Sequence, residues 1–279
     1  MDASAHRPVA IAVAPNGGRL TKADHPALPV EPSELAATAS ACRDAGAAMI
    51  HLHVRDRDGR HLLDAEAYRR ATDAVRAAVG DELVVQITSE ALGIYSPAEQ
   101  MDVVRSVRPE AVSLALRELA PDEAAEAEFA TFLAWLSQER IVPQIILYEP
   151  GEACRLDDMA RRGVIPFDSI PVLFVLGRYV PGQQSAPDDV LPFLAPDMPR
   201  FESWMLCAFG LRETACVTAA ALLGGNARVG FENNLFLPDG RRAPDNAALV
   251  EATATAIGAS GLRSAVASEL REEWAGMFS

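Results

Sequence analysis

Lysine is almost absent from this chain of 279 residues, because Lys22 is the only one among 25 Lys and Arg residues. A catalytic imine requires a desolvated lysine amine. Lys22 stands in a polar stretch, so we do not expect a lysine-imine aldolase. Positive charge is scarce as well, since 39 Asp and Glu residues give a formal net charge of −14. So acidic a chain lacks the bulk positive charge that binds nucleic acid or anionic membranes, and we expect neither partner.

Cysteines are few and show no CxxC pair, so neither a disulfide framework nor a structural zinc site is expected from Cys42, Cys154, Cys207 and Cys216. No run approaches the ~20 apolar residues that span a membrane. The beginning of the chain also lacks the apolar segment of a signal peptide. These absences predict a soluble, cytoplasmic protein with reduced thiols.

Short apolar runs instead alternate with amphipathic stretches along the whole chain. The runs predict strands at 9–14, 47–54, 83–88, 111–116, 141–148, 169–176, 201–209 and 227–232. The stretches between them predict helices at 33–45, 64–79, 97–107, 122–137, 152–162, 211–223 and 244–257. Residues 177–199 are the longest loop-like stretch.

Repeated strand–helix units imply parallel strands joined by right-handed crossovers. Eight such units in a chain of this length predict an α/β fold, a (β/α)8 TIM barrel forming a single domain over residues 1–279. The alternative is an open doubly wound sheet, which normally has a glycine-rich nucleotide loop after its first strand. The loop here, APNGGRLT, does not match GxGxxG.

The motif HLHVRD gives the strongest indication of chemistry. His51 and His53 are two residues apart in a predicted strand, so their side chains project to the same side. Paired imidazoles at the carboxyl end of a barrel strand suit a divalent transition metal. The alternative is two hydrogen-bonded barrel histidines. No histidine follows His61, so a later ligand would be a carboxylate, a cysteine or water.

The motif RVGFENN is the best source of that ligand. Arg228 and Glu232 share parity on the last predicted strand and would both face the barrel interior. A buried arginine and carboxylate are costly unless they are paired or bound to a metal. Glu232 therefore either completes a two-histidine, one-carboxylate site or forms a structural pair with Arg228.

Several polar residues at other strand ends could enter the same cavity. Thr88 and Glu90 share parity at the end of the third strand, and Ser113 lies on the fourth. Asn16 and Arg19 stand in the loop after the first strand. For each of them the alternative is an ordinary local or surface role.

The chain resembles the beta-keto acid cleavage enzymes, a family typified by 3-keto-5-aminohexanoate cleavage enzyme. The motifs that carry this resemblance are HPALPVEPSE, HLHVRD, VQIT, IVPQIILYEPG, FVLG and RVGFENN, which span almost the whole chain. The resemblance implies a (β/α)8 barrel, a homotetramer, and zinc held by His51, His53 and Glu232. It also implies that a small-molecule β-keto acid reacts with acetyl-CoA to give acetoacetate and a new CoA thioester.

The resemblance assigns further roles. Thr88 and Ser113 match hydroxyl positions that bind the acetoacetate end of the substrate, and Arg228 matches an arginine that helps an acidic residue to remove a proton. That acidic residue is Asn233 here, and an amide is no general base. Glu90 is the candidate replacement, because it follows Thr88 on the same parity; the family typically has glycine at this position.

A second group of departures concerns the substrate. In the typical family member, the loop after strand one carries a glutamate that binds a substrate amine; this chain has Arg19 there. The glutamate-bearing strand PEVEV reads PQIIL over residues 143–147. We therefore expect a keto acid whose distal group is anionic or neutral. The alternatives are a zinc-dependent lyase or hydrolase that does not use CoA, and a binding protein without catalytic activity.

Overall fold

A closed barrel of eight parallel strands forms the centre of the computed structural model, which describes residues 7–278. The strands follow the order β1-β10-β9-β8-β7-β6-β5-β2 around the barrel. Their bounds are β1 Ile11–Val13, β2 Met49–Leu52, β5 Val84–Thr88, β6 Ala111–Ala115, β7 Val142–Leu147, β8 Val172–Leu176, β9 Trp204–Ala208 and β10 Asn226–Val229. The predicted (β/α)8 barrel is confirmed. One of the histidines, His6, lies outside the described residues.

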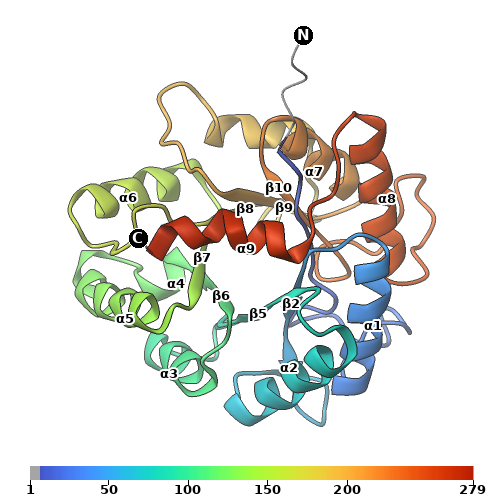
Figure 1. The fold of residues 1–279 in the computed structure, drawn as a ribbon, viewed down its shortest axis with the longest axis horizontal. Coiled ribbons are helices and arrows are strands. Elements are labelled where there is room, and N and C mark those ends of the chain that lie inside the picture. Colours follow the sequence, from blue (N-terminus) through green and yellow to red (C-terminus); the bar gives the residue numbers. More distant parts are fainter. Residues whose placement is uncertain (1–6, 279) are drawn as a thin grey trace.

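Helices surround this barrel (Figure 1). They are α1 Pro32–Asp44, α2 Ala65–Val79, α3 Pro97–Val107, α5 Glu126–Glu139, α6 Pro150–Arg161, α7 Glu213–Leu222 and α8 Asn246–Ala259. Two of them have clear N-caps: the Asp64 side chain, before α2, accepts from the Ala67 N–H, and Ser96, before α3, forms a capping box with Glu99. All seven predicted helices are present with boundaries shifted by a few residues.

Several elements of the structure were not predicted. A hairpin of β3 Val54–Arg55 and β4 His61–Leu62 follows β2, and 3-10 turns occur at Glu123–Ala125, Pro187–Phe193 and Gly276–Phe278. The short helix α4 Leu116–Leu119 and the helix α9 Ala267–Ala275 complete the set. Each is too short, or too far from a regular apolar period, to be distinguished from a loop in the sequence. The turn at Pro187–Phe193 corrects the expectation that residues 177–199 are entirely irregular.

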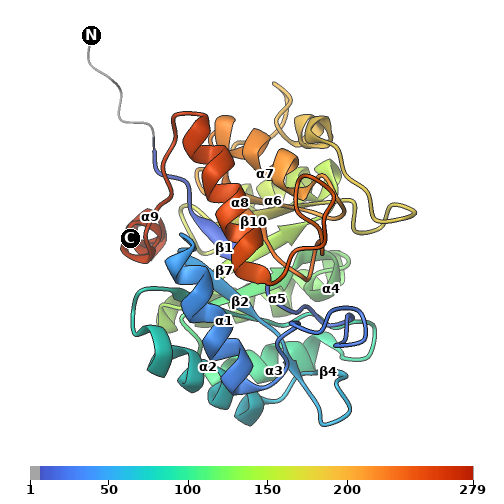
Figure 2. The ribbon, with the colours of Figure 1, turned by 90° about the vertical axis from the view of Figure 1, so that its right-hand side faces the viewer.

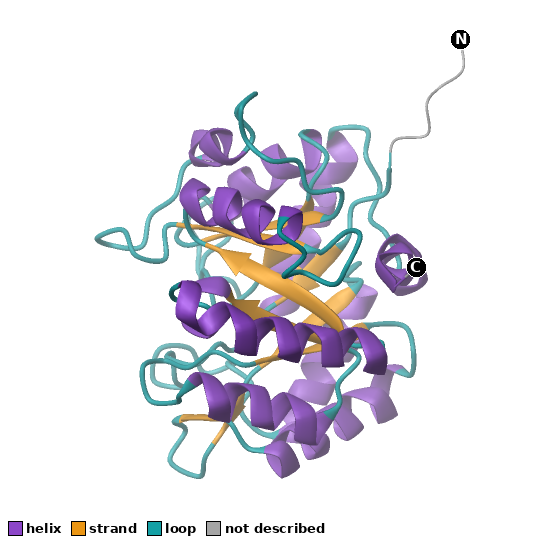
Figure 3. Cartoon of the chain, turned by 90° about the vertical axis from the view of Figure 1, so that its left-hand side faces the viewer, coloured by secondary structure: helices purple, strands orange, loops and turns teal. Residues whose placement is uncertain are grey.

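The helix α9 closes the barrel at the amino ends of its strands, and it lies across the barrel in Figure 1. Arg271 of α9 donates to the Leu83 carbonyl at 3.0 Å and to Glu110 at 2.6 Å, beside the starts of β5 and β6. Figures 2 and 3 show the β3–β4 hairpin at the other end of the barrel. The carboxyl ends of the strands are therefore the face left for a site, as in other barrels of this kind.

The strands are all shorter than the predicted ranges, and two of these differences affect the site. β2 ends at Leu52, so His53 lies just beyond it; β10 ends at Val229, so Glu232 lies in a turn. The turn begins at Gly230, whose φ of +132° is unfavourable for any other residue. The prediction that Glu232 lies on the last strand was therefore wrong, although its side chain still enters the barrel mouth. Within residues 7–278, no helix is both long and apolar enough to cross a membrane.

We expect Gly230→Ala to destabilise the protein strongly. The added Cβ would overlap the Ala14 carbonyl oxygen, and the positive φ adds strain of its own. Gly240→Ala is the matched control, because Gly240 also has a positive φ, +85°, but open space around it. Urea unfolding should show a loss of about 1 kcal/mol for Gly240→Ala and about 3 kcal/mol or more for Gly230→Ala. Equal losses would contradict the close approach at Ala14.

Candidate functional site

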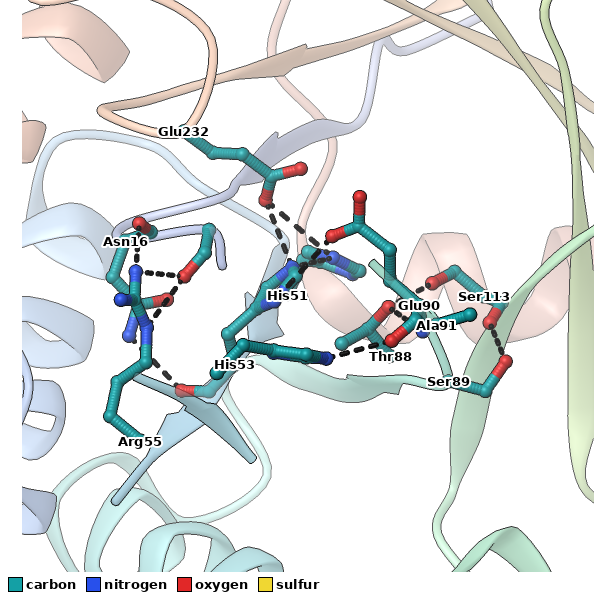
Figure 4. Close-up of polar contacts among 12 residues, drawn as sticks. Asn16, His51, His53, Arg55, Thr88, Ser89, Glu90, Ala91, Ser113 and Glu232 are labelled. Carbon is teal, nitrogen blue, oxygen red and sulfur yellow. Dashed lines mark hydrogen bonds and ion pairs between the residues drawn. The ribbon is translucent and has the colours of Figure 1, made fainter. Parts of the chain in front are cut away.

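Three predicted ligand atoms converge at the carboxyl end of the barrel (Figure 4). The Nε2 atoms of His51 and His53 lie 3.2 Å apart, and Glu232 Oε2 lies 3.7 Å from the first and 3.3 Å from the second. Both histidines are only 1% exposed. The geometry therefore brings together the two-histidine, one-carboxylate group that the sequence suggested.

These separations fit a metal ion. Ligand bonds of about 2.0–2.2 Å in tetrahedral geometry place the ligand atoms roughly 3.3 Å apart. Glu232 Oε2 is buried and has no hydrogen-bond partner among the described residues, as expected of a ligand atom. His51 Nδ1 lies 2.7 Å from Gln86 Oε1, so an Nδ1–H tautomer leaves the Nε2 lone pair free for a metal. Gln86 in turn donates to Gln144 Oε1 at 3.1 Å, which holds its amide in place.

The charges of the site also favour a metal-binding state. Burial, assisted by the nearby Arg228 charge, lowers the pKa of His51 to about 3, so its imidazole is neutral at pH 7. Burial would raise the pKa of Glu232, but Arg228 and His53 outweigh this effect and hold the pKa well below its ordinary value. Arg228 pairs with Glu232 through Oε1 and leaves Oε2 toward the histidines. The structural pair and the ligand role are therefore compatible.

A buried carboxylate that the sequence analysis missed shapes the turn carrying Glu232. Glu213, at the start of α7, accepts the Gly230 N–H at 3.1 Å and the Asn234 side-chain amide at 3.3 Å. Asn246 accepts the Phe231 N–H at 2.9 Å. Burial raises the pKa of Glu213 well above its ordinary value. The sequence offered little sign of this role, because an acidic residue in the first turn of a helix is usually read as a dipole partner.

The loop after β1 is joined to the histidines by Asn16. Its side-chain amide donates to the His53 carbonyl and to the Pro29 carbonyl, each at 3.0 Å, while its Oδ1 has no partner among the described residues. Arg55, which was not predicted, donates to the Gly17 carbonyl at 2.9 Å through Nε. The predicted substrate residue Asn16 therefore also fixes the backbone beside a metal-ligand candidate.

The remaining predicted residues lie around two connected features of the barrel mouth. A cavity of about 620 Å³ is lined by Asn16, Arg19, Glu90, Glu232 and Asn233, and a smaller space of about 20 Å³ by the histidines and Thr88. Ser113 lies beside Thr88 and donates to its hydroxyl oxygen at 3.2 Å. Ser113 is therefore near the site but behind Thr88.

Glu90 projects between a cation and an imidazole. Its Oε1 lies 3.3 Å from Arg178 Nη2, and its Oε2 lies 4.0 Å from His53 Nδ1. Its N–H donates to the Thr88 hydroxyl at 3.0 Å, and His61 Nε2 lies 2.7 Å from its carbonyl oxygen. The structure thus places the predicted carboxylate at the cavity, with its backbone held from both sides.

Unpaired positive charge is found at the cavity wall. Arg19 and Arg212 line the larger cavity, and within residues 7–278 neither forms an ion pair. Arg178 lines it too, but this arginine pairs with Glu90 and lies over the Phe209 ring. Arg178 and Arg212 were not predicted, because each lies in a loop just beyond a strand, where no strand parity indicates the direction of its side chain.

Asn233 occupies the wall between the metal-ligand group and a thiol. Its backbone N–H donates to Gly230 at 2.8 Å, whereas its side-chain amide has no hydrogen-bond partner among the described residues. Burial raises the pKa of the buried Cys207 thiol to about 11, with the Arg228 charge opposing this rise. The arrangement offers hydrogen-bonding groups here but no base.

Comparison with known proteins agrees with this geometry. A family model for beta-keto acid cleavage enzyme matches residues 8–274. The 3-keto-5-aminohexanoate cleavage enzyme of Fusobacterium nucleatum is 30% identical over 244 residues, 84% of this chain and 86% of that protein. The 3-oxoadipate:acetyl-CoA acetyltransferase of Cupriavidus necator is 27% identical over 259 residues, 89% of this chain and 88% of that protein. The binary complex of ObcA with oxaloacetate has the same fold, with a TM-score of 0.70 at 15% identity, over 90% of this chain and 68% of that one.

The buried histidines predict a specific pH dependence of stability. Burial, reinforced by His53, lowers the pKa of His61 to about 4, against about 6.5 in an unfolded chain. Between these values the unfolded state binds a proton that the folded state does not, so stability falls as the pH falls. Urea unfolding should show that the free energy of unfolding of the metal-free wild type falls between pH 7 and pH 5. In His61→Gln this fall should be smaller by up to about 2 kcal/mol. An unchanged loss in the variant would contradict the burial of a neutral imidazole.

Proposed function

The chain belongs to the beta-keto acid cleavage enzyme family, and we propose that it cleaves a β-keto acid with acetyl-CoA at a bound zinc ion. The reaction gives acetoacetate and a new acyl-CoA, so one carbon–carbon bond forms, another breaks, and CoA passes from the acetyl group to the new acyl group. The observation that carries this proposal is the convergence of His51, His53 and Glu232 at the cavity floor. A homotetramer in the cytoplasm, as the resemblance and composition suggested, is part of the proposal.

The residues of the site would have the following roles. His51, His53 and Glu232 hold the metal, which when bound supplies a Lewis acid for the keto oxygen. Thr88 would bind the acetoacetate end, with Ser113 orienting its hydroxyl through their 3.2 Å contact.

Proton removal from the acetyl methyl group requires a carboxylate near Arg228. Glu90 lines the smaller space together with Arg228, so we propose it as the proton acceptor in place of Asn233. Asn233 would contribute a hydrogen bond from its unpartnered amide.

The unpaired arginines favour a substrate whose distal group is anionic. Arg19 and Arg212 line the cavity without a carboxylate of the chain to neutralise them. A carboxylate in reach of a guanidinium forms strong, charge-assisted hydrogen bonds. Of the two relatives above, one is named for an amino keto acid and the other for 3-oxoadipate, which has a second carboxylate. We propose that the substrate resembles the latter in charge.

A second candidate function follows from Asn233. If no carboxylate replaces the family's acidic residue, the same centre could act as a lyase or hydrolase without CoA. The loss of a general base at Asn233 is the observation that favours this alternative.

Turnover with metal tests the main proposal. Zinc-loaded protein, incubated with acetyl-CoA and a panel of β-keto acids, should form acetoacetate and a new thioester in equal amounts. Chelation of the metal, or His51→Ala, should abolish both products, because the ligand group is incomplete. Mass spectrometry of the thioesters, together with an acetoacetate assay, checks this result. Cleavage of a keto acid without thioester would instead favour the alternative that does not use CoA.

Charge reversal at Arg19 tests the substrate proposal. Arg19→Glu should lower kcat/KM for keto acids with a distal carboxylate by roughly 10–100-fold, since a charge-assisted hydrogen bond is replaced by repulsion. The kcat/KM for keto acids with a distal amine should rise relative to that for keto acids with a distal carboxylate. Arg200→Glu is the matched control, because Arg200 is exposed and precedes β9, at the opposite end of the barrel. An unchanged substrate profile in Arg19→Glu would contradict the proposal.

A further inference from the structure

The two histidines of the candidate metal centre are not supported equally. The ring nitrogen of His51 that faces away from the centre, Nδ1, contacts Gln86 Oε1 at 2.7 Å. The corresponding Nδ1 of His53 is buried and has no hydrogen-bond partner among the described residues. Metal-binding histidines almost always donate this second N–H to a carboxylate, a carbonyl or water, which fixes the ring and its tautomer. His53 therefore needs a partner that the contacts within hydrogen-bond distance do not supply.

Glu90 is placed to be that partner, and we propose that it positions His53 by accepting a hydrogen bond from Nδ1. This inference rests on the proposed metal site. Glu90 Oε2 lies 4.0 Å from His53 Nδ1, so a side-chain rotation that shortens this separation by about 1.2 Å makes the bond. The Glu90 side chain is 16% exposed, which leaves it room for such a rotation at the cavity wall.

The surroundings of Glu90 restrain it on the side away from His53. Its backbone is fixed by the Thr88 hydroxyl and by His61, as described above, so only its side chain has to move. Arg178 Nη2 lies 3.3 Å from the other carboxylate oxygen, Oε1, and holds that oxygen by an ion pair. A carboxylate held in this way presents one oxygen to Arg178 and one to the imidazole.

Glu90 would therefore orient the His53 imidazole as Gln86 orients that of His51. Gln86 lies under His51 on β5, and Glu90 follows the same strand two residues after Thr88. One strand and its extension would then orient both imidazoles. The positioning role is separate from the proton transfer proposed for Glu90, because it is exerted on His53 and is present without substrate.

Zinc affinity of the folded protein tests this inference without reference to activity. Metal-free wild type, Glu90→Ala, Gln86→Ala and Arg19→Ala are titrated with zinc in competition with a chromophoric chelator. We expect Glu90→Ala and Gln86→Ala to weaken zinc binding by about 10–100-fold each, as is usual when the partner of a ligating histidine is removed. Arg19→Ala is the matched control from the same cavity, since it contacts no ligand candidate, and should bind zinc as wild type does.

The possible results separate the inference from the proposed function. Wild-type affinity in Glu90→Ala, together with weakened binding in Gln86→Ala, would overturn the positioning role and leave the metal site intact. Failure of the wild-type protein itself to bind zinc would overturn the metal site and this inference together. Urea unfolding of each metal-free variant confirms that a lower affinity does not result from loss of the fold.

A second variant distinguishes the two roles of Glu90. Glu90→Gln is assayed at zinc concentrations that fill the site, so its turnover reports on proton transfer alone. Glu90→Ala should combine a weakened zinc affinity with a turnover that saturating zinc does not restore, because it lacks both the positioning carboxylate and the proposed proton acceptor. If saturating zinc restores no activity while zinc affinity is unchanged, Glu90 acts on the substrate only and the inference fails.

Discussion

The pairing of Arg228 with Glu232 is the interaction on which the site depends. A carboxylate buried beside two imidazoles is costly unless an opposite charge and hydrogen bonds compensate it. Arg228, itself only 3% exposed, provides that charge through one carboxylate oxygen and leaves the other toward His51 and His53. Burial keeps His51 neutral and the same guanidinium reinforces this effect, so one cation acts on the pKa of two ligand candidates.

The barrel makes this pairing precise by fixing the turn that carries Glu232. Arg228 is held on β10 between β1 and β9, whereas Glu232 lies beyond the strand, in a turn whose N–H groups bond to Glu213, Asn246 and Ala14. Gly230 permits the backbone to pass close to Ala14. Rigid strands and a fully hydrogen-bonded turn thus place groups distant in sequence within bonding reach of one metal ion.

Much of this arrangement could be predicted from the sequence, and the limits have physical causes. The apolar runs gave the barrel strands because parallel strands are buried on both faces. HxH and Glu232 could be found because paired histidines and a carboxylate at strand ends are chemically distinctive and of the kinds that bind metals. Glu213 and Arg178 could not, because their roles depend on long-range contacts with Gly230 and Glu90 that no local pattern records. The end of β10 was misplaced because Phe231 continues the apolar period of the strand although Gly230 has already turned the backbone.

The charge of the cavity differs from that of the molecule as a whole. The chain has a net charge of −14, yet the two carboxylates of the site, Glu232 and Glu90, are each matched by an arginine, Arg228 and Arg178. Arg19 and Arg212 then remain as positive charge at the mouth. Because exposed charges act over only about 8–10 Å at physiological salt, a ligand that reaches the mouth is governed by these arginines rather than by the acidic surface beyond. An acidic protein can in this way select an anionic substrate. In our proposal Arg19 would make that selection, from a loop that also carries Asn16, the residue bonded to His53.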